Sequence, residues 1–329
     1  MKSTLNYPLV ENPYEKDDID SGISVLKSSF ITMGKKTTEF EKIFTKKLNT
    51  KYSLMVNSGS SANLLIFQCL TNPMRKKKLL PGDEVIIPSL CWSTSLWPII
   101  QSNLKPIFVD INSETLNICE KKIEEKITSR TKAIMLVHVL GNSCNFDKIL
   151  SLKKKYNLII IEDTCESLGS KYKKSYLGSI GDFSSFSFYS SHQISSGEGG
   201  MVTCRNQEDY EIIKSLRSHG WSRGLVNEKK ISNKFKNLDK KFIFINSGYN
   251  LRPTDISAAI GLSQFKKLDR FIKIRSNNRN KIKKYFQNEK ILRDNIKIVN
   301  ENKNVKASWF GISLIILNKK IDKFKLLKD

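Results

Sequence analysis

Short apolar runs alternate with longer amphipathic stretches through most of the chain. The runs have the length and the Val, Ile and Phe content of buried strands, and they lie at 84–88, 105–110, 132–141, 157–163 and 184–189. Helix-like stretches precede or separate them, near 60–71, 93–102, 118–127 and 145–156. Because strands that alternate with helices form parallel sheets covered by helices, we expect an α/β fold with a mostly parallel sheet.

The pattern changes near residue 265. From there the sequence predicts one long basic helix, followed by one strand at 308–317 and one further helical stretch. We therefore expect a large domain over residues 1–265, N-terminal segment included, and a small α+β domain over 266–329. With so few elements after the helix, the small domain looks incomplete.

Length and composition are those of a globular protein. The chain has 329 residues, of which 39% are hydrophobic, enough to bury a large core. No apolar run approaches the eighteen or so residues of a membrane span. The N-terminal stretch MKSTLNYPLVENPYEKDD lacks the apolar core of a signal peptide, so a cytoplasmic location and no membrane partner are expected.

The distribution of charge and of cysteines argues against a nucleic-acid-binding protein and against a metal site. The 56 Lys and Arg residues against 32 Asp and Glu give a net charge of +24, which suits nucleic acid as a partner. However, the lysines are scattered without interleaved aromatic residues, so we expect solvated surfaces, no nucleic-acid partner and a field that suits a small anionic substrate. The six cysteines never form CxxC, so we expect reduced, mostly buried thiols and no metal site.

Candidate ligand groups follow the predicted strands, where open α/β sheets bind ligands. Gly59, Ser60 and Ser61 begin a helix, and its free N–H groups would bind a phosphate, although a plain N-cap remains equally open. Trp92 follows the strand at 84–88 and would serve either as a ring-stacking plate or as core packing.

Asp163 ends the strand at 157–163. A carboxylate that closes an apolar run is desolvated and needs a cationic partner, such as a protonated pyridine nitrogen, although a helix N-cap is the alternative. A phosphate cup, an aromatic plate and a carboxylate are together the requirements for holding pyridoxal phosphate. The GEGG sequence at 197–200 leads into a strand rather than a helix, so it predicts a loop with unusual backbone angles.

At the level of whole motifs, the chain resembles the DegT/DnrJ/EryC1/StrS sugar aminotransferase family of aspartate-aminotransferase fold. That family carries S-G-[ST]-A-N-L, E-D, S-F-x(4)-K-x(4)-G-E-G-G and G-Y-N-x-R. Here the corresponding segments are SGSSANLL, IEDTCES, SFYSSHQISSGEGG and GYNLRPTDISAAIGLSQF. The likeness covers nearly the whole chain and implies a three-layer, fold-type I pyridoxal-phosphate enzyme. The main departure is that His192 replaces the family's cofactor-bonding lysine.

The motifs imply roles for individual residues. On the cofactor, Gly59, Ser60 and Ser187 would bind the phosphate, Trp92 would stack on the ring, and Asp163 would pair with the pyridine nitrogen, with Glu166 close by. On the substrate, Ser29, Phe30, Ile31 and Thr32 would meet the nucleotide, and His219 and Arg223 would contact the diphosphate sugar. Asn250 and Arg252 would reach the cofactor and substrate of a neighbouring subunit, which implies a homodimer.

His192 narrows the implied activity, because an imidazole moves protons but cannot bond the cofactor aldehyde. The chain resembles the branch of the family that removes the C3 hydroxyl of a nucleotide-linked 4-keto-6-deoxyhexose in O-antigen biosynthesis. L-Glutamate would form pyridoxamine phosphate, and GDP-4-keto-6-deoxy-D-mannose is the implied substrate. Cys204 is the only cysteine after His192, which excludes the relatives that carry an iron–sulfur cluster there.

Two alternatives stay open at this stage. The chain could be an aminotransferase that leaves its amine on the sugar, or an inactive relative. His138 is expected to be a hydrogen-bonded residue on a buried strand, without a role as a ligand.

Overall fold

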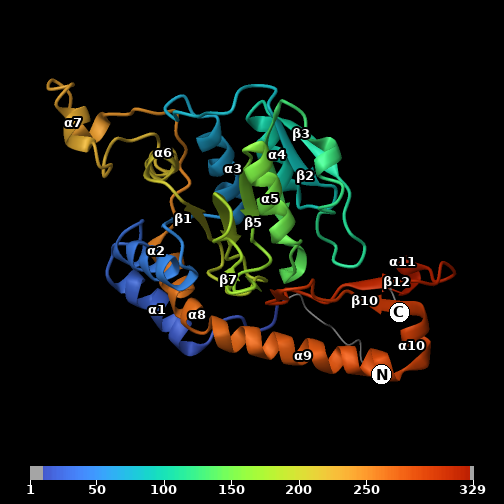
Figure 1. Ribbon diagram of the computed structural model, residues 1–329. Helices are drawn as coiled ribbons and strands as arrows, with labels where there is room; N and C mark the ends of the chain where they lie inside the picture. The colour runs from blue at the N-terminus through green and yellow to red at the C-terminus, as the bar shows by residue number, and fades with distance from the viewer. Residues whose placement is uncertain (1–9, 327–329) are drawn as a thin grey trace.

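A seven-stranded sheet forms the centre of the molecule (Figure 1). The structure is a computed structural model that describes residues 10–326. The strand order is β1-β9-β8-β5-β4-β2-β3, and within this sheet β9 runs against the other six strands. The strands are β1 Tyr52–Val56, β2 Glu84–Pro88, β3 Lys105–Val109, β4 Thr131–Val137, β5 Ile159–Asp163, β8 Phe183–Ser187 and β9 Gly200–Cys204. The expected mostly parallel α/β fold is confirmed.

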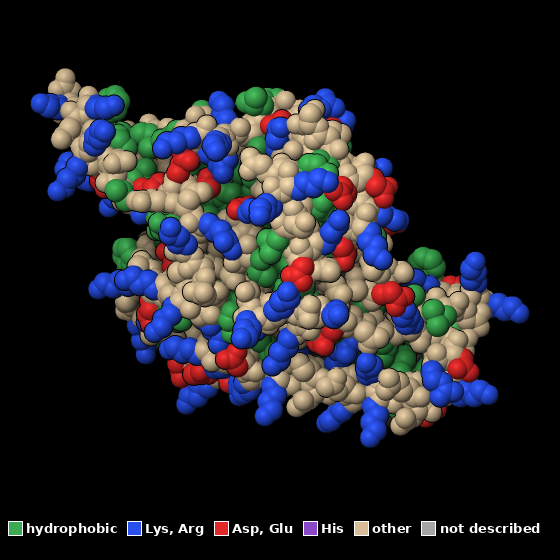
Figure 2. Space-filling view, in the orientation of Figure 1, with side chains coloured by type: hydrophobic (Ala, Val, Ile, Leu, Met, Phe, Trp, Pro, Cys, Tyr) green, Lys and Arg blue, Asp and Glu red, His purple; other side chains and the backbone are tan. Residues whose placement is uncertain are grey.

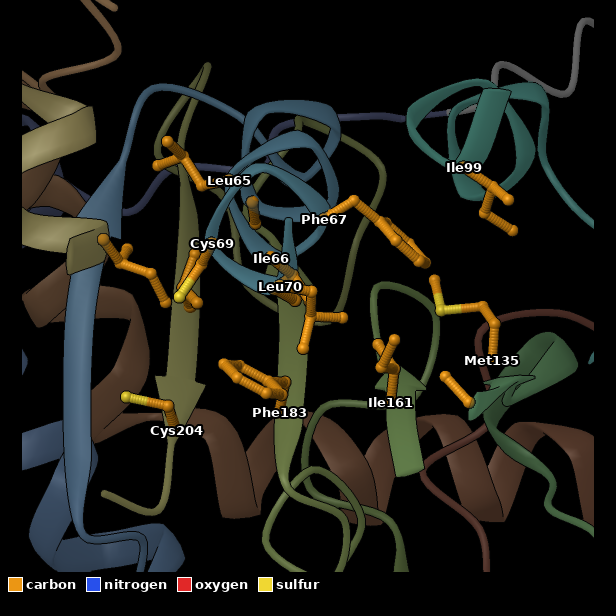
Figure 3. Close-up of a cluster of buried hydrophobic side chains, with 14 of the residues drawn as sticks. Leu65, Ile66, Phe67, Cys69, Leu70, Ile99, Met135, Ile161, Phe183 and Cys204 are labelled. Atoms are coloured by element: carbon orange, nitrogen blue, oxygen red, sulfur yellow. The ribbon is translucent and has the colours of Figure 1, made fainter. Parts of the chain in front are cut away.

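Helices cover both faces of the sheet, which gives three layers. Side chains alternate along each strand: Leu54 and Val56 of β1 face one cluster, and Met55 faces another. The first face packs against α3 Gly59–Leu70, α4 Ser93–Gln101 and α6 Gln207–Arg217; the second packs against α5 Phe146–Tyr156, α2 Lys35–Leu48 and α8 Asp255–Lys266. Figure 3 shows the first cluster, in which Phe67 and Leu70 of α3 lie over Ile161 and Phe183 of the strands.

One predicted helix is wrong. Residues 118–127 contain only a short 3₁₀ turn, Glu124–Lys126. Ile118 bridges Ile111, and the Cys119 N–H donates to the Asp110 carbonyl at 2.9 Å, so this segment folds back onto the end of β3. Leu116 makes the reversal with a positive φ of 59°. A backbone that is already paired in this way cannot form the i to i−4 bonds of an α-helix.

The C-terminal region begins with the long basic helix that the sequence predicts, α9 Leu268–Asn288. The predicted strand at 308–317 forms only over β12 Leu314–Ile316, because Phe310 is instead held by its N–H bond to the Leu140 carbonyl, at 3.0 Å. The other elements here are α10 Lys290–Asn295, β10 Ile296–Ile298, which pairs with β12, β11 Val305–Lys306 and α11 Lys323–Leu326. The domain boundary at residue 265 stays a prediction.

The remaining short elements lie around this framework. They are α1 Lys16–Lys27, β6 Lys171–Tyr172, β7 Ser175–Tyr176 and α7 Glu228–Ser232. Helix α1 packs on α8, and β6 pairs with both β7 and β11. Further 3₁₀ turns lie at Val139–Gly141 and Lys240–Phe242. The segment that carries α7 projects from the body of the molecule (Figure 1). Within residues 10–326, none of the helices has the length and apolar character needed to span a membrane. Half of the N-terminal stretch used for the signal-peptide prediction, residues 1–9, lies outside the described residues.

Candidate active site

A cavity of about 620 Å³ opens at the carboxyl ends of the central strands. Its wall is formed by the segments that follow β1, β2, β4, β5 and β8. This is the edge at which open α/β sheets bind ligands, and the volume is that of a typical cofactor site. Seven predicted residues line it together: Gly59, Ser60, Trp92, Asp163, Glu166, Ser187 and His192.

The N-terminus of α3 forms one end of the cavity. Ser58 is the N-cap, since its hydroxyl accepts a bond from the Ser61 N–H at 3.1 Å, and Ser60 is left exposed with its hydroxyl 3.0 Å from that of Thr94. A Cβ added at Gly59 would lie 2.7 Å from the Ser187 Cβ, so the helix start meets the end of β8 as closely as a glycine permits. Free N–H groups at such a helix start favour an anion.

The GEGG loop explains part of this close packing. A Cβ at Gly200 would lie 2.5 Å from the carbonyl carbon of Ser58, so only glycine lets β9 begin against the start of α3. Gly197 has a positive φ of 78°. The glycines therefore serve the backbone geometry that the sequence predicts, and they bring the loop after His192 back beside the helix terminus.

Asp163 is a buried carboxylate, 5% exposed, at the end of β5. One oxygen accepts from the Asn63 side-chain amide at 2.9 Å and from the Ser95 hydroxyl at 2.7 Å, and the other accepts from the Cys165 N–H at 3.2 Å. All three donors are neutral. A desolvated carboxylate that faces a cavity without a cation among these partners suits a positively charged ligand atom.

Trp92 and Glu166 complete the side walls. Trp92, at the N-cap position of α4, is 71% exposed although it belongs to the cavity wall, so its ring is available for stacking rather than used in the core. Glu166 accepts a bond from the Leu140 N–H at 2.7 Å. Burial, together with the nearby charge of Asp163, raises the pKa of the Glu166 carboxyl, so this side chain holds a proton more readily than a free carboxyl does.

His192 lies in the loop after β8, with its imidazole packed edge-on against Phe310 at 5.1 Å between ring centroids and against Tyr189 at 6.2 Å. Its backbone N–H donates to the Tyr189 carbonyl at 3.0 Å. Burial lowers the pKa of the imidazole to about 4; the charge of Asp163 opposes this shift, and the charge of Arg275 adds to it. The imidazole is therefore neutral near pH 7 and is able to accept a proton.

His138 differs partly from expectation. It follows β4, is 1% exposed, and its Nε2 lies 3.1 Å from a carboxylate oxygen of the buried Glu162. Its Nδ1, however, is buried without a hydrogen-bond partner among the described residues, and His138 lines the cavity. The prediction of a buried histidine is confirmed, whereas only one of its two ring nitrogens is paired.

Sequence reasoning missed several wall residues. Asn63 carried a signal, because a polar residue among the apolar residues of a helix needs a hydrogen-bond partner. It is 1% exposed, and Asp163 is its partner. Tyr189 carried none, and neither did Ser95, which donates to Asp163 without lining the cavity. Glu198 belongs to the GEGG sequence, which predicted only a backbone feature. Phe310 comes from the far end of the chain, and no local pattern places it beside His192.

The other predicted binding residues do not line this cavity. Arg252 bonds the Asn250 side chain at 3.1 Å and lies over the Trp221 ring at 5.5 Å, while His219 packs against the same ring at 5.1 Å. The segment Ser29, Phe30, Ile31 and Thr32 is exposed and bridges to Thr254, and Arg223 is exposed as well. Their predicted roles toward a substrate remain predictions.

No group of three or more His, Cys, Asp or Glu side chains in the described part of the chain is arranged to hold a metal ion. The six cysteines are free thiols, and Cys69, Cys144 and Cys204 are buried.

The residues present fit pyridoxal phosphate. The helix start at Gly59 and Ser60 suits the phosphate, the exposed Trp92 suits a ring face, and the uncompensated Asp163 suits a protonated pyridine nitrogen. Fold and cavity together define an enzyme of the fold-type I, pyridoxal-phosphate class. Residues 13–329 match the sequence model of the DegT/DnrJ/EryC1/StrS aminotransferase family, and the chain belongs to that family.

Known proteins similar to this chain include dehydratases, one of them with bound pyridoxal phosphate. The GDP-4-keto-6-deoxy-D-mannose 3-dehydratase of Escherichia coli O55:H7 is 38% identical over 314 residues, which are 95% of this chain and 79% of that protein. A structure of the E. coli dehydratase with bound hydrated pyridoxal phosphate superposes with a TM-score of 0.90 at 36% identity, over 98% of this chain and 82% of the other. A structure of a histidine-to-asparagine variant of GDP-4-keto-6-deoxymannose-3-dehydratase, with bound GDP-perosamine, also superposes with a TM-score of 0.90 at 36% identity. The superposition covers 98% of this chain and 83% of the other. Pyridoxal phosphate is the cofactor typical of this family.

Proposed function

We propose that the protein is a pyridoxal-phosphate-dependent 3-dehydratase of a nucleotide-linked 4-keto-6-deoxyhexose, with L-glutamate as the amine donor. GDP-4-keto-6-deoxy-D-mannose is the proposed substrate. The observation that carries the proposal is the place of His192. It stands where the family motif has a lysine, in the wall of a cavity that also contains Asp163, Ser187 and the start of α3.

Each wall residue has a defined task in this proposal. Gly59, Ser60 and Ser187 hold the phosphate, Trp92 covers one face of the ring, and Asp163 holds the protonated ring nitrogen. Glu166, a wall residue whose pKa is raised by burial, would supply a protonated carboxyl to the bound ligand. When bound, the cofactor supplies an electron sink for bonds broken on its amine substituent.

His192 moves the protons. Its imidazole is neutral at working pH because burial lowers its pKa, so it accepts a proton from carbon and then delivers it to the oxygen of the departing C3 hydroxyl. A positioned base of this kind contributes on the order of a hundred- to ten-thousand-fold to the rate. Loss of the C3 hydroxyl as water leaves an unsaturated amine on the sugar; after release it tautomerises to an imine, and hydrolysis with one water yields ammonia and a ketone on the sugar product.

The test is a product analysis. The purified protein is incubated with pyridoxal phosphate, L-glutamate and GDP-4-keto-6-deoxy-D-mannose. Ammonia is measured with an enzymatic assay, and the mass of the nucleotide-sugar product is determined by mass spectrometry. We expect ammonia and a 3-deoxy sugar in equal amounts, and neither with His192→Asn.

The main competing function is that of an aminotransferase, the activity for which the family is described. It predicts an amino sugar, 2-oxoglutarate and no ammonia from the same mixture. That result would replace the dehydratase proposal. A protein that is folded and binds the cofactor, yet yields neither product from any keto sugar supplied, would instead indicate an inactive relative.

A further inference from the structure

Arg275 of α9 reaches the backbone of the His192 loop. Its Nη2 donates to the His192 carbonyl at 3.2 Å, and its Nη1 donates to the Phe310 carbonyl at 3.1 Å and to the Trp309 carbonyl at 3.5 Å. The guanidinium is half-buried, and burial lowers its pKa. Neutral carbonyls are its hydrogen-bond partners among residues 10–326, so its positive charge is not neutralised there by a carboxylate.

These bonds constrain the imidazole from two sides. Phe310 is the ring that packs edge-on against His192, at 5.1 Å between centroids. One planar guanidinium therefore fixes both the backbone of the histidine and the backbone of the ring beside it. Arginine suits this task better than lysine, because its donors diverge in a rigid fork.

Arg275 also places a positive charge next to the histidine. The titratable groups that share a cavity wall with His192 are Asp163, Glu166, Glu198, His138, Cys91, Cys165, Tyr189 and, on the side of α9, Glu11 and Arg275 itself. Asp163 favours the protonated imidazole, and Arg275 opposes it. Burial also disfavours the protonated imidazole, so loss of Arg275 removes one of the two effects that oppose Asp163 and should raise the pKa of His192.

We propose that Arg275 is a positioning residue for His192: it fixes the orientation of the imidazole through the carbonyls of His192 and Phe310. The part of this inference that concerns catalysis rests on the proposed dehydratase function. The part that concerns the geometry and charge of His192 does not.

Arg279, one turn further along α9, provides a matched control. It donates to the Val299 carbonyl at 2.6 Å and its guanidinium lies 3.9 Å from the centre of the Trp309 ring, so it anchors the same C-terminal region without touching the His192 loop. Arg279→Lys therefore disturbs the packing of this region but leaves the contacts of His192 unchanged.

The decisive measurement is a histidine NMR titration of the full chain. The protein has three histidines, so the His192 ring signal is assigned by its loss in His192→Asn. We expect Arg275→Met to raise the titration midpoint of His192 by roughly half a pH unit or more, because a like charge is removed. Arg275→Lys keeps the charge and should titrate near the wild type, and so should Arg279→Lys. Equal midpoints in the wild type and Arg275→Met, or an equal shift in Arg279→Lys, would overturn the proposal.

Activity supplies the second readout. We expect kcat of Arg275→Met to fall about tenfold with little change in KM, as for loss of an oriented base, with a partial recovery in Arg275→Lys. Unchanged kcat in a folded Arg275→Met would also overturn the proposal. Circular dichroism shows whether Arg275→Met folds. If it does not fold, Arg275→Lys alone tests the proposal. The proposal then requires kcat of Arg275→Lys to fall while kcat of Arg279→Lys stays near that of the wild type. If no variant or wild type shows dehydration, the proposed function fails, and the NMR titration still decides the role of Arg275 in positioning His192.

Discussion

His192 lies in surroundings that oppose a positive charge on its ring. Burial is the main cause, and it holds the pKa at about 4, below the 6.5 of an ordinary histidine. Between these two pH values the unfolded chain binds a proton at this position and the folded protein does not. His192 therefore lowers the free energy of unfolding as the pH falls from about 6.5 to about 4, and has no such effect above that range.

This pH dependence is a prediction that needs no substrate. The difference in unfolding free energy between the wild type and His192→Asn should change by up to about 3 kcal/mol between pH 7 and pH 4, with the wild type losing relative stability toward acid. Denaturant titrations at several pH values measure it. Carboxylates that also titrate in this range, such as Glu166, affect both proteins and cancel in the difference. A difference that is constant with pH would show that the imidazole is not buried.

A second prediction at this scale concerns the bond that His192 cannot make. Borohydride treatment of the wild type with pyridoxal phosphate should leave no cofactor attached to the chain, whereas His192→Lys restores a primary amine and should give an adduct that mass spectrometry places at position 192. His192→Lys should also lose most dehydration, since its amine is then tied to the cofactor. A stable adduct on a native lysine of the wild type would contradict this assignment.

At the residue scale, the sequence predicted those site residues that end a strand or directly follow one. Asp163 and Ser187 end strands, Trp92 and Glu166 follow strands closely, and all of them line one cavity because parallel strands end at a common edge. Phe310 and Arg275 could not be predicted. They reach His192 through tertiary packing of the C-terminal region, which leaves no trace in local periodicity.

Among the elements, α3 depends on glycine at its first residue. A Cβ at Gly59 would meet the Ser187 Cβ at 2.7 Å and the Cys165 Sγ at 2.8 Å, both in the wall of the cavity. Real Cβ atoms do not approach other atoms so closely, so either the helix start or the end of β8 has to move. Both carry the groups that are expected to hold the cofactor phosphate.

Gly59→Ala is therefore predicted to weaken binding of pyridoxal phosphate about tenfold or more while the protein stays folded, because displaced N–H groups no longer converge on the anion. An absorbance or fluorescence titration with the cofactor measures the affinity. Gly311→Ala is the matched control, since an added Cβ there meets only the Leu140 Cδ2 at 3.7 Å. Unchanged affinity in Gly59→Ala would remove α3 from the proposed phosphate site.

The elements that the sequence did not predict correctly include the segment at 118–127 and the strand β1. The inner strands of the central sheet were predictable because both of their faces are buried, which makes them continuous apolar runs; the edge strand β3 is more exposed but keeps an apolar run. The stretch at 118–127 has helix-like spacing, but its backbone pairs with the segment after β3, and the tertiary hydrogen bonds decide. The short strand β1 was also missed, although it forms the edge of the sheet next to β9.

For the whole molecule, the net charge of +24 lies mainly on exposed lysines. Figure 2 shows Lys and Arg side chains spread over the visible face among acidic ones rather than gathered in one stripe. We predict weak binding to random duplex DNA that disappears at physiological salt, since scattered phosphate contacts are lost by counterion screening. Fluorescence anisotropy at two salt concentrations tests this, and tight binding in 150 mM salt would indicate a nucleic-acid partner.

Several large apolar side chains stay exposed in the cavity wall, at the predicted substrate residues or beside them. Trp92 is 71% exposed, Phe30 59%, and Phe244, whose ring stacks on Trp221, 51%. Together with Asn250 and Arg252, which lie outside the cavity of their own chain, they fit the proposal of a homodimer in which each subunit completes the site of the other.

Subunit complementation tests that proposal. His192→Asn and the double variant Asn250→Ala/Arg252→Ala should each be inactive alone, because every site lacks either its base or the groups supplied by the neighbour. After the two are mixed and allowed to exchange subunits, half of the dimers contain one of each, and each such dimer has one intact site, so about a quarter of the wild-type activity should return. A mixture of His192→Asn with Asp163→Asn is the control. Both of these residues come from the same wall, so no mixed dimer has an intact site and no activity should return. If differently tagged subunits co-purify but the first mixture stays as inactive as the control, then Asn250 and Arg252 do not act across a subunit boundary.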